Sequence, residues 1–167
     1  MNRLKLAAAC VGLQLLFFAG WAGREQVRLV SGASILVKVV PVDPRDLLRG
    51  QYLRLAYEFS RPWDSTAARI NVPVGARVWV VLRRDGGFYV PKQLLLARPE
   101  ALDSDVVAIA GRASRRFGPW YEFGVEQYFV HEGVETPAVS DLTVRLRVTR
   151  SGIARIQQVY VKGVPWP

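Results

Sequence analysis

Hydrophobic residues in this chain follow two patterns, one uninterrupted run near the N-terminus and then a series of short alternating segments. The run extends from Leu6 to Gly23 and contains no charged residue, while Arg3 and Lys5 precede it. About 17–25 apolar residues are needed to cross the hydrocarbon core of a bilayer. We therefore expect a membrane anchor over residues 1–24, with a cleaved signal sequence as the alternative.

The charges around this run also predict an orientation. Arg3 and Lys5 favour retention of the short N-terminal side in the cytoplasm, by the positive-inside rule. Residues 25–167 would then form one domain outside the cytoplasm, since their length suits a single hydrophobic core. The expected location is the cytoplasmic (inner) membrane, which the chain would cross once.

The rest of the chain alternates apolar and polar residues with a period of two, which is typical of strands with one buried face. Asp85-Gly86 and Ser151-Gly152 predict hairpin turns. The four C-terminal residues, Val-Pro-Trp-Pro, are expected not to continue a ladder, because proline lacks an N–H. The predicted fold class is mainly β, an antiparallel β-sandwich or small barrel-like domain after one transmembrane helix. Strands are expected over residues 34–40, 51–59, 77–82, 88–96, 105–113, 120–123, 142–149 and 153–161.

A short helical turn is predicted between the first two strands. Asp43 suits the N-cap, Pro44 the first helical position, and Gly50 the left-handed residue after the last turn. Residues 61–74 are rich in turn-forming residues and predict a loop.

Residues 50–57 read Gly-Gln-Tyr-Leu-Arg-Leu-Ala-Tyr, and here the chain resembles the membrane-anchored family named for its Gly-Asp-Tyr-x-x-Leu-x-Tyr motif (GDYXXLXY). Gly50, Tyr52, Leu55 and Tyr57 match that motif, while Gln51 replaces the family's Asp. The resemblance implies a membrane-anchored exported protein. It supplies no reaction, because the function of that family is undefined.

Two further stretches are similar to sequences of the same family. Asp43-Pro44-Arg45-Asp46 resembles the element that leads into the motif. A Gly-x-Glu-x-Tyr-Phe segment lies about seventy residues later and contributes Gly124, Glu126, Tyr128 and Phe129.

Two interpretations of the motif stay open. In the structural one, Leu55 and Tyr57 enter the core and Tyr52 points to the opposite face of the strand. In the functional one, Asp43, Arg45, Asp46 and Tyr52 line one end of the sheet as a docking or ligand patch, since loops at a rigid sheet end often carry binding groups.

The sequence shows no constellation that requires catalysis, a cofactor or a transition metal. Cys10 is the only cysteine and His131 the only histidine. The enzymatic alternative is a Ser/Lys dyad of Ser34 with Lys38 or Lys92, by analogy with membrane-anchored β-rich signal peptidases. An oxygen-only calcium site at the Asp103-Ser104-Asp105 turn also stays open.

We therefore expect a non-enzymatic binding or interaction module of the cell envelope, with a membrane or envelope protein as partner. The net charge of +9 is scattered along the chain and is densest at Arg83–Arg84 and at residues 112–116. Nucleic acid is not expected as a partner, because neither a single basic stripe nor an RNA-binding signature accompanies this charge. Anionic lipid headgroups are a further candidate partner.

Overall fold

The computed structural model describes residues 3–30, 32–40, 52–63, 70–114, 120–130, 134 and 137–166. The chain forms two compact units, Met1–Gly32 and Ala33–Pro167. The first holds the only α-helix of the described residues and the second holds all of their strands.

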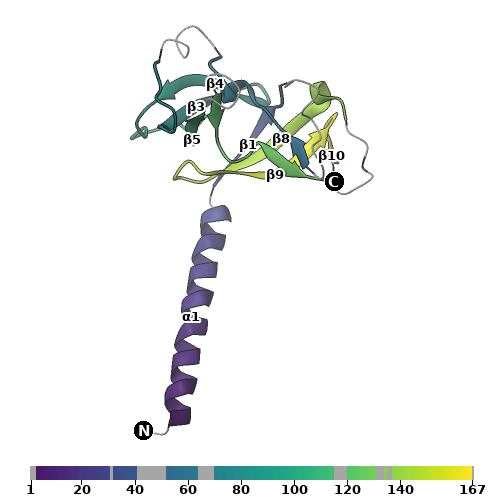
Figure 1. The fold of residues 1–167 in the computed structure, drawn as a ribbon. Helices are drawn as coiled ribbons and strands as arrows, with labels where there is room; N and C mark the ends of the chain where they lie inside the picture. Colours follow the sequence, from purple (N-terminus) through teal and green to yellow (C-terminus); the bar gives the residue numbers. More distant parts are fainter. Residues whose placement is uncertain are drawn as a thin grey trace. The chain divides into compact units, whose positions relative to one another are not determined.

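Helix α1 extends over Arg3–Val30 and confirms the predicted N-terminal helix (Figure 1). It continues beyond residue 24, where the anchor was expected to end, because Arg24, Glu25 and Gln26 all have good helix propensity. Its predicted membrane crossing is not supported: in the described part of the chain, no helix combines the length and apolarity that a membrane span requires.

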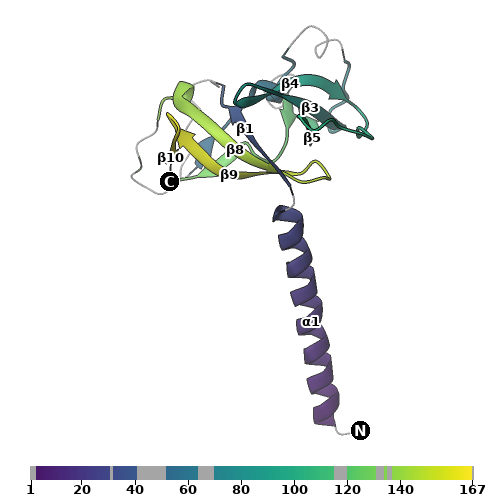
Figure 2. The same cartoon turned by 180° about the vertical axis from the view of Figure 1, so that it is seen from behind.

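The second unit is mainly β, as the sequence predicted, and its antiparallel sheets form a half-barrel. Figure 1 and its reverse view, Figure 2, show the two four-stranded sheets on different sides of this unit. One sheet has the order β1 (Ala33–Lys38), β8 (Leu142–Val148), β9 (Ala154–Val161), β10 (Val164–Trp166). The other has the order β4 (Phe88–Leu95), β3 (Arg77–Asp85), β5 (Val106–Ser114), β6 (Trp120–Glu122). In a two-stranded sheet, β2 (Tyr52–Arg54) pairs with β7 (Gln127–Phe129). Two short 3-10 helices complete the unit, η2 (Glu58–Ser60) and η3 (Val139–Asp141).

The core is built from the inward positions of these strands. In β8, Val144, Leu146 and Val148 are buried while the intervening Arg145 is exposed, so the alternation read from the sequence is confirmed. In β3, by contrast, residues 78–82 are buried on both faces of the strand: Val78, Val80 and Leu82 on one face and Trp79 and Val81 on the other.

The predicted strand over residues 51–59 is shorter than expected. Regular pairing ends at Arg54, and Tyr57 makes an isolated bridge to Val39 before the chain enters η2. The turn closes locally, because the Ser60 N–H donates to the Tyr57 carbonyl at 2.9 Å and the Ser60 hydroxyl accepts from the Tyr57 N–H at 3.2 Å. Side chains that compete for backbone groups in this way end regular structure.

The expectation that the C-terminal residues cannot extend a ladder is wrong. Strand β10 pairs with β9, and Pro165 lies opposite Tyr160. The missing N–H of proline is tolerated because β10 is an edge strand. Lys162 and Gly163 make the connection with φ angles of 50° and 83°, the positive values that two-residue hairpin turns require.

The turn between β8 and β9 joins the two four-stranded sheets. Gly152 has a φ of +82°, and its carbonyl accepts a hydrogen bond from the Ala110 N–H of β5 at 2.9 Å. A Cβ at this position would lie 2.3 Å from the indole ring of Trp79. Only glycine therefore permits both the backbone conformation and the close approach.

We expect Gly152→Ala to lower the free energy of unfolding more than Gly163→Ala does. Both substitutions place alanine at a φ near +80°, which costs about 1–2 kcal/mol. At Gly163 a Cβ meets nothing within 4 Å, whereas overpacking against Trp79 should cost a further 1–3 kcal/mol, approximately, at Gly152. Urea unfolding followed by tryptophan fluorescence would measure both; equal losses would show that Gly152 is not sterically constrained.

Candidate functional site

The two sequence stretches that resemble the family motif pair with each other. Strand β2 is antiparallel to β7, with Leu53 opposite Tyr128. Past the end of β2, the Leu55 N–H donates to the Glu126 carbonyl at 2.8 Å. We call residues 52–57 together with residues 123–129 the motif ribbon.

The motif ribbon is also tied to the sheet of β1. The Val40 N–H donates to the Ala56 carbonyl at 2.9 Å, beside the bridge between Val39 and Tyr57. Ala56 is buried although the alternation predicted it to be outward, because backbone lies on both sides of this segment. The motif segment thus connects the end of β1 to β7.

Tyr57 is the buried centre of the motif ribbon. Its hydroxyl donates to the Val125 carbonyl at 2.7 Å, and its ring stacks on Phe59 with centroids 5.0 Å apart. Phe59 in turn makes an edge contact with Phe123 at 5.2 Å. Burial raises the pKa of Tyr57 well above its ordinary value and the nearby Glu126 carboxylate raises it further. The phenol therefore stays protonated and acts as a hydrogen-bond donor to the fold.

Glu126 closes the turn that precedes β7. Gly124 adopts a φ of +78°, and the Glu126 carboxylate accepts hydrogen bonds from the N–H groups of Phe123 at 2.5 Å and Gly124 at 2.9 Å. Successive N–H groups of this kind form an anion-binding concavity, here filled by a side chain of the same segment. Burial raises the pKa of Glu126, against the lowering effect of these N–H donors.

Some of the remaining motif residues lie within the described part of the chain, and the others lie outside it. Tyr128 is partly buried, with its ring 6.0 Å from that of Trp166, while Phe129 is 74% exposed. Tyr52 pairs through its backbone with Phe129. Outside the described residues lie Asp43, Pro44, Arg45, Asp46, Gly50 and Gln51, so the docking patch and the capped turn stay predictions.

The structure does not bring Ser34 and Lys38 together as a dyad. Both lie in β1, and four residues of strand separate them by about 13 Å. The Ser34 hydroxyl lies 3.0 Å from the Gln157 side-chain amide, and the Lys38 ammonium lies 4.8 Å from the ring centroid of Phe88. Neither contact activates a nucleophile.

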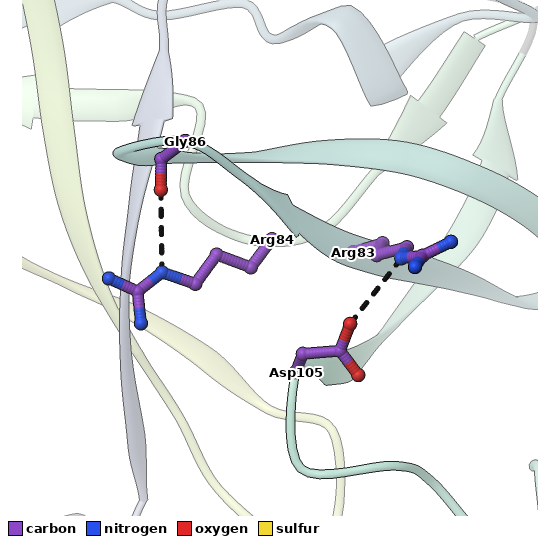
Figure 3. Close-up of polar contacts among 4 residues, drawn as sticks. All are labelled: Arg83, Arg84, Gly86 and Asp105. Carbon is purple, nitrogen blue, oxygen red and sulfur yellow. Dashed lines mark hydrogen bonds and ion pairs between the residues drawn. The ribbon is translucent and has the colours of Figure 1, made fainter.

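Both side chains of the basic doublet Arg83–Arg84 contact nearby groups, Arg84 within its own hairpin and Arg83 at the start of β5 (Figure 3). Arg83 Nε lies 3.4 Å from Asp105 Oδ2, and Arg84 Nε donates to the Gly86 carbonyl at 3.4 Å. Asp105, a candidate calcium ligand, thus faces a cation. In the ranges that the structure describes, no group of three or more His, Cys, Asp or Glu side chains is placed to hold a metal ion; His131 lies outside those ranges.

A concentration of charge that sequence reasoning missed lies on the outward side of β1, β8 and β9. We call its four cationic residues the basic face: Lys38, Arg145, Arg147 and Arg155. Part of the signal was present, because the alternation of residues 142–149 points Arg145 and Arg147 outward, whereas the pairing of Arg147 with Arg155 is set by the turn of the folded chain.

The fold and the site define a small β-rich module whose characteristic motif is a structural ribbon and contains no catalytic cluster within the described residues. The chain belongs to the family described as GDYXXLXY protein, whose model matches residues 14–159. No match was found among curated proteins or among solved structures.

We expect Tyr57→Phe to lower the free energy of unfolding by about 1–3 kcal/mol, because it leaves the buried Val125 carbonyl without its donor. Tyr160→Phe is the control, since the ring of Tyr160 is only partly buried and keeps its contact with Arg145. Denaturant unfolding of both variants checks this. A loss no greater than that of the control would mean that the hydroxyl bond is not needed.

Glu126 predicts a pH dependence. Its native pKa is raised, so between the unfolded and native pKa values the native state holds more protons, and stability from this group declines as pH rises through the native pKa. In Glu126→Gln that decline should be absent, so the variant should gain stability relative to wild type as pH rises from below 4.5 towards neutrality. Unfolding at several pH values measures this gain, with the exposed Glu100→Gln as control, because Glu100 is not among the groups that shift the pKa of Glu126. A constant difference between wild type and Glu126→Gln would contradict the assignment.

Proposed function

We propose that this protein is a non-enzymatic interaction module of the cell envelope, held at the cytoplasmic membrane by α1, with its β unit outside the cytoplasm. The observation that carries the proposal is the apolar surface of α1. Large apolar side chains between 54% and 72% exposed surround that helix: Val11, Leu13, Leu15, Leu16, Phe17, Phe18, Trp21 and Val27.

These side chains do not form one stripe. Residues 15–18 are consecutive, and a turn of 100° per residue sends their side chains in four different directions. Burying such a side chain stabilises by about 1.5–3 kcal/mol, so exposure of eight in water is costly. A segment whose large apolar side chains point in all directions is stabilised by an apolar environment on all sides. Lipid provides that environment, and Trp21 suits the interfacial region near the end of the apolar run.

We propose a non-enzymatic role because the polar side chains of the described site make hydrogen bonds within the fold. Tyr57 and Glu126 bind backbone groups of the motif ribbon, and Ser34 lies against Gln157. Groups committed to the fold in this way are poor candidates for a reaction. A further envelope component, such as a membrane protein, would then be bound by the surface of the β unit.

The single native cysteine, Cys10, supports a direct test of the membrane contact. Cys10 is exposed in the structure. We expect it to resist a maleimide reagent in isolated membranes and to react after detergent is added, because lipid covers it. Labelling at full rate in intact membranes would overturn the membrane contact.

The orientation requires a second reporter. In a Cys10→Ser background, Gly87→Cys should react with a membrane-impermeant maleimide on intact cells, because the hairpin would lie outside the cytoplasm. A Cβ at Gly87 meets nothing within 4 Å, so the substitution fits the turn. Labelling only after cell lysis would place the β unit inside and contradict the proposed orientation.

A further inference from the structure

We infer that two copies of this chain associate in the membrane through helix α1, with their Gln14 side chains hydrogen-bonded to each other where the helices meet. The inference rests on the proposed function, because it requires α1 to lie in lipid, and it names a second copy of this chain as a partner. Three observations carry it: the position of Gln14 in the apolar run, the chemistry of the helix around it, and the residues that share its side of α1.

Gln14 is the one side chain in the run from Leu6 to Gly23 that both donates and accepts strong hydrogen bonds. It lies at the middle, with eight residues of the run before it and nine after it (6–13 and 15–23). At a rise of about 1.5 Å per residue, the ends of the run are about 12–14 Å away along the helix axis. Long Lys and Arg side chains near a helix end can extend to the headgroups, but the shorter Gln14 cannot do so from this depth.

The helix itself offers little to this amide. Gln14 is exposed on α1, and the side chains one turn away from it are those of Cys10, Val11, Phe17 and Phe18. Of these only Cys10 carries a polar group, and a thiol is a weak donor and acceptor. In water the solvent would bond the Gln14 amide, whereas in hydrocarbon the amide requires a partner from another molecule.

A second copy of the same chain provides that partner at the correct depth. Both copies have the same sequence and would insert in the same orientation, so a parallel pair places the two Gln14 side chains at one level. A carboxamide has an acceptor oxygen and a donor nitrogen, so two of them can satisfy each other across a two-fold axis. A helix of another protein would need a polar group of its own at that level.

The residues on the same side of α1 as Gln14 suit contact with another helix. We call Ala7, Cys10, Gln14, Phe18 and Trp21 the Gln14 face. At about 100° per residue, Ala7 and Trp21 point within about 20° of Gln14, and the other two within about 40°. Steps of three and four residues repeat along this face, which is the spacing that helices use when they pack side by side at a small angle. All five side chains are exposed in the structure, so the face is available to a second helix.

Polarity distinguishes the Gln14 face from the other sides of the helix. Lipid tails are as apolar as leucine, so apolar contacts alone give two helices in a membrane little preference for one side. A hydrogen bond between helices supplies that preference. On the opposite side of α1, about 160° from Gln14, Gly12 and Leu16 offer no such group.

The first test measures association of the full chain in phosphatidylcholine vesicles by fluorescence energy transfer. In a Cys10→Ala background, Gly87→Cys carries the donor on one batch of protein and the acceptor on another, and transfer should rise with the protein-to-lipid ratio. Gln14→Leu should weaken the association by about 5- to 30-fold, the range expected for hydrogen bonds between membrane helices. Gln14→Asn keeps an amide and should retain most of the association.

Leu16→Ala is the matched control for these variants. It changes the opposite side of α1 at nearly the same depth, so it should leave the association unchanged. Leucine and glutamine have similar helix propensities, so Gln14→Leu should keep α1 helical, which circular dichroism checks.

The native cysteine tests which side of α1 is in contact. Cys10 lies one turn from Gln14 on the Gln14 face, so facing copies bring two thiols together. Iodine, which enters lipid, should oxidise them to a disulfide and yield a covalent dimer, while each thiol loses its proton and iodine is reduced to iodide. In the variant C10A/L16C the thiol lies on the opposite side, and little dimer should form. Equal yields from the two proteins would overturn the Gln14 face as the contact.

Failure of the inference and failure of the proposed function give different results. Protein that does not float with vesicles would overturn the membrane contact of α1, and the inference with it. Protein that floats but shows no energy transfer at any protein-to-lipid ratio would overturn the pairing of two copies and leave the membrane contact intact. A Gln14→Leu variant that associates as tightly as wild type would do the same.

Discussion

The backbone pairing between residues 52–55 and residues 126–129 is the constraint on which the β unit depends. It brings together two segments about seventy residues apart, so its formation requires closure of a long loop, at a cost that the buried contacts must exceed. Tyr57 supplies several of these contacts at once, through its hydroxyl bond to Val125 and its stacking on Phe59. Leu55 and Tyr57 of the motif and Glu126 of the second family-like stretch are thus explained by packing and hydrogen bonding.

A second long-range contact completes the half-barrel. The β8–β9 turn lies against β5 through Gly152, whose lack of a side chain lets the backbone approach Trp79. The motif ribbon and this turn both tie sheets of the β unit together, and both contain a glycine with a positive φ angle, Gly124 in one and Gly152 in the other.

Much of the fold could be predicted from local pattern, because alternation and turn residues act over a few positions. The hairpins at Asp85-Gly86 and Ser151-Gly152 and the burial of Leu55 and Tyr57 are confirmed. Several details were not predicted: the short extent of β2, the strand β7, the pairing of β10 and the continuation of α1 to Val30. The extent of β2 depends on which group competes for a backbone hydrogen bond, and the pairing of β10 depends on its edge position; neither is encoded in periodicity.

For the candidate site, the sequence by itself determined which residues are distinctive and which strand positions point outward, since both follow from residue identity and a period of two. Tyr57 was predicted to enter the core in this way, whereas Glu126 was singled out by the resemblance to the family; the neighbours of these two side chains were not predicted. Only the tertiary structure decided that the two motif stretches pair, that Ser34 and Lys38 do not form a dyad, and that Arg147 lies opposite Arg155. The physical reason is register: a strand carries its own alternation, but which residue it faces is set by the other strands and turns of the folded chain.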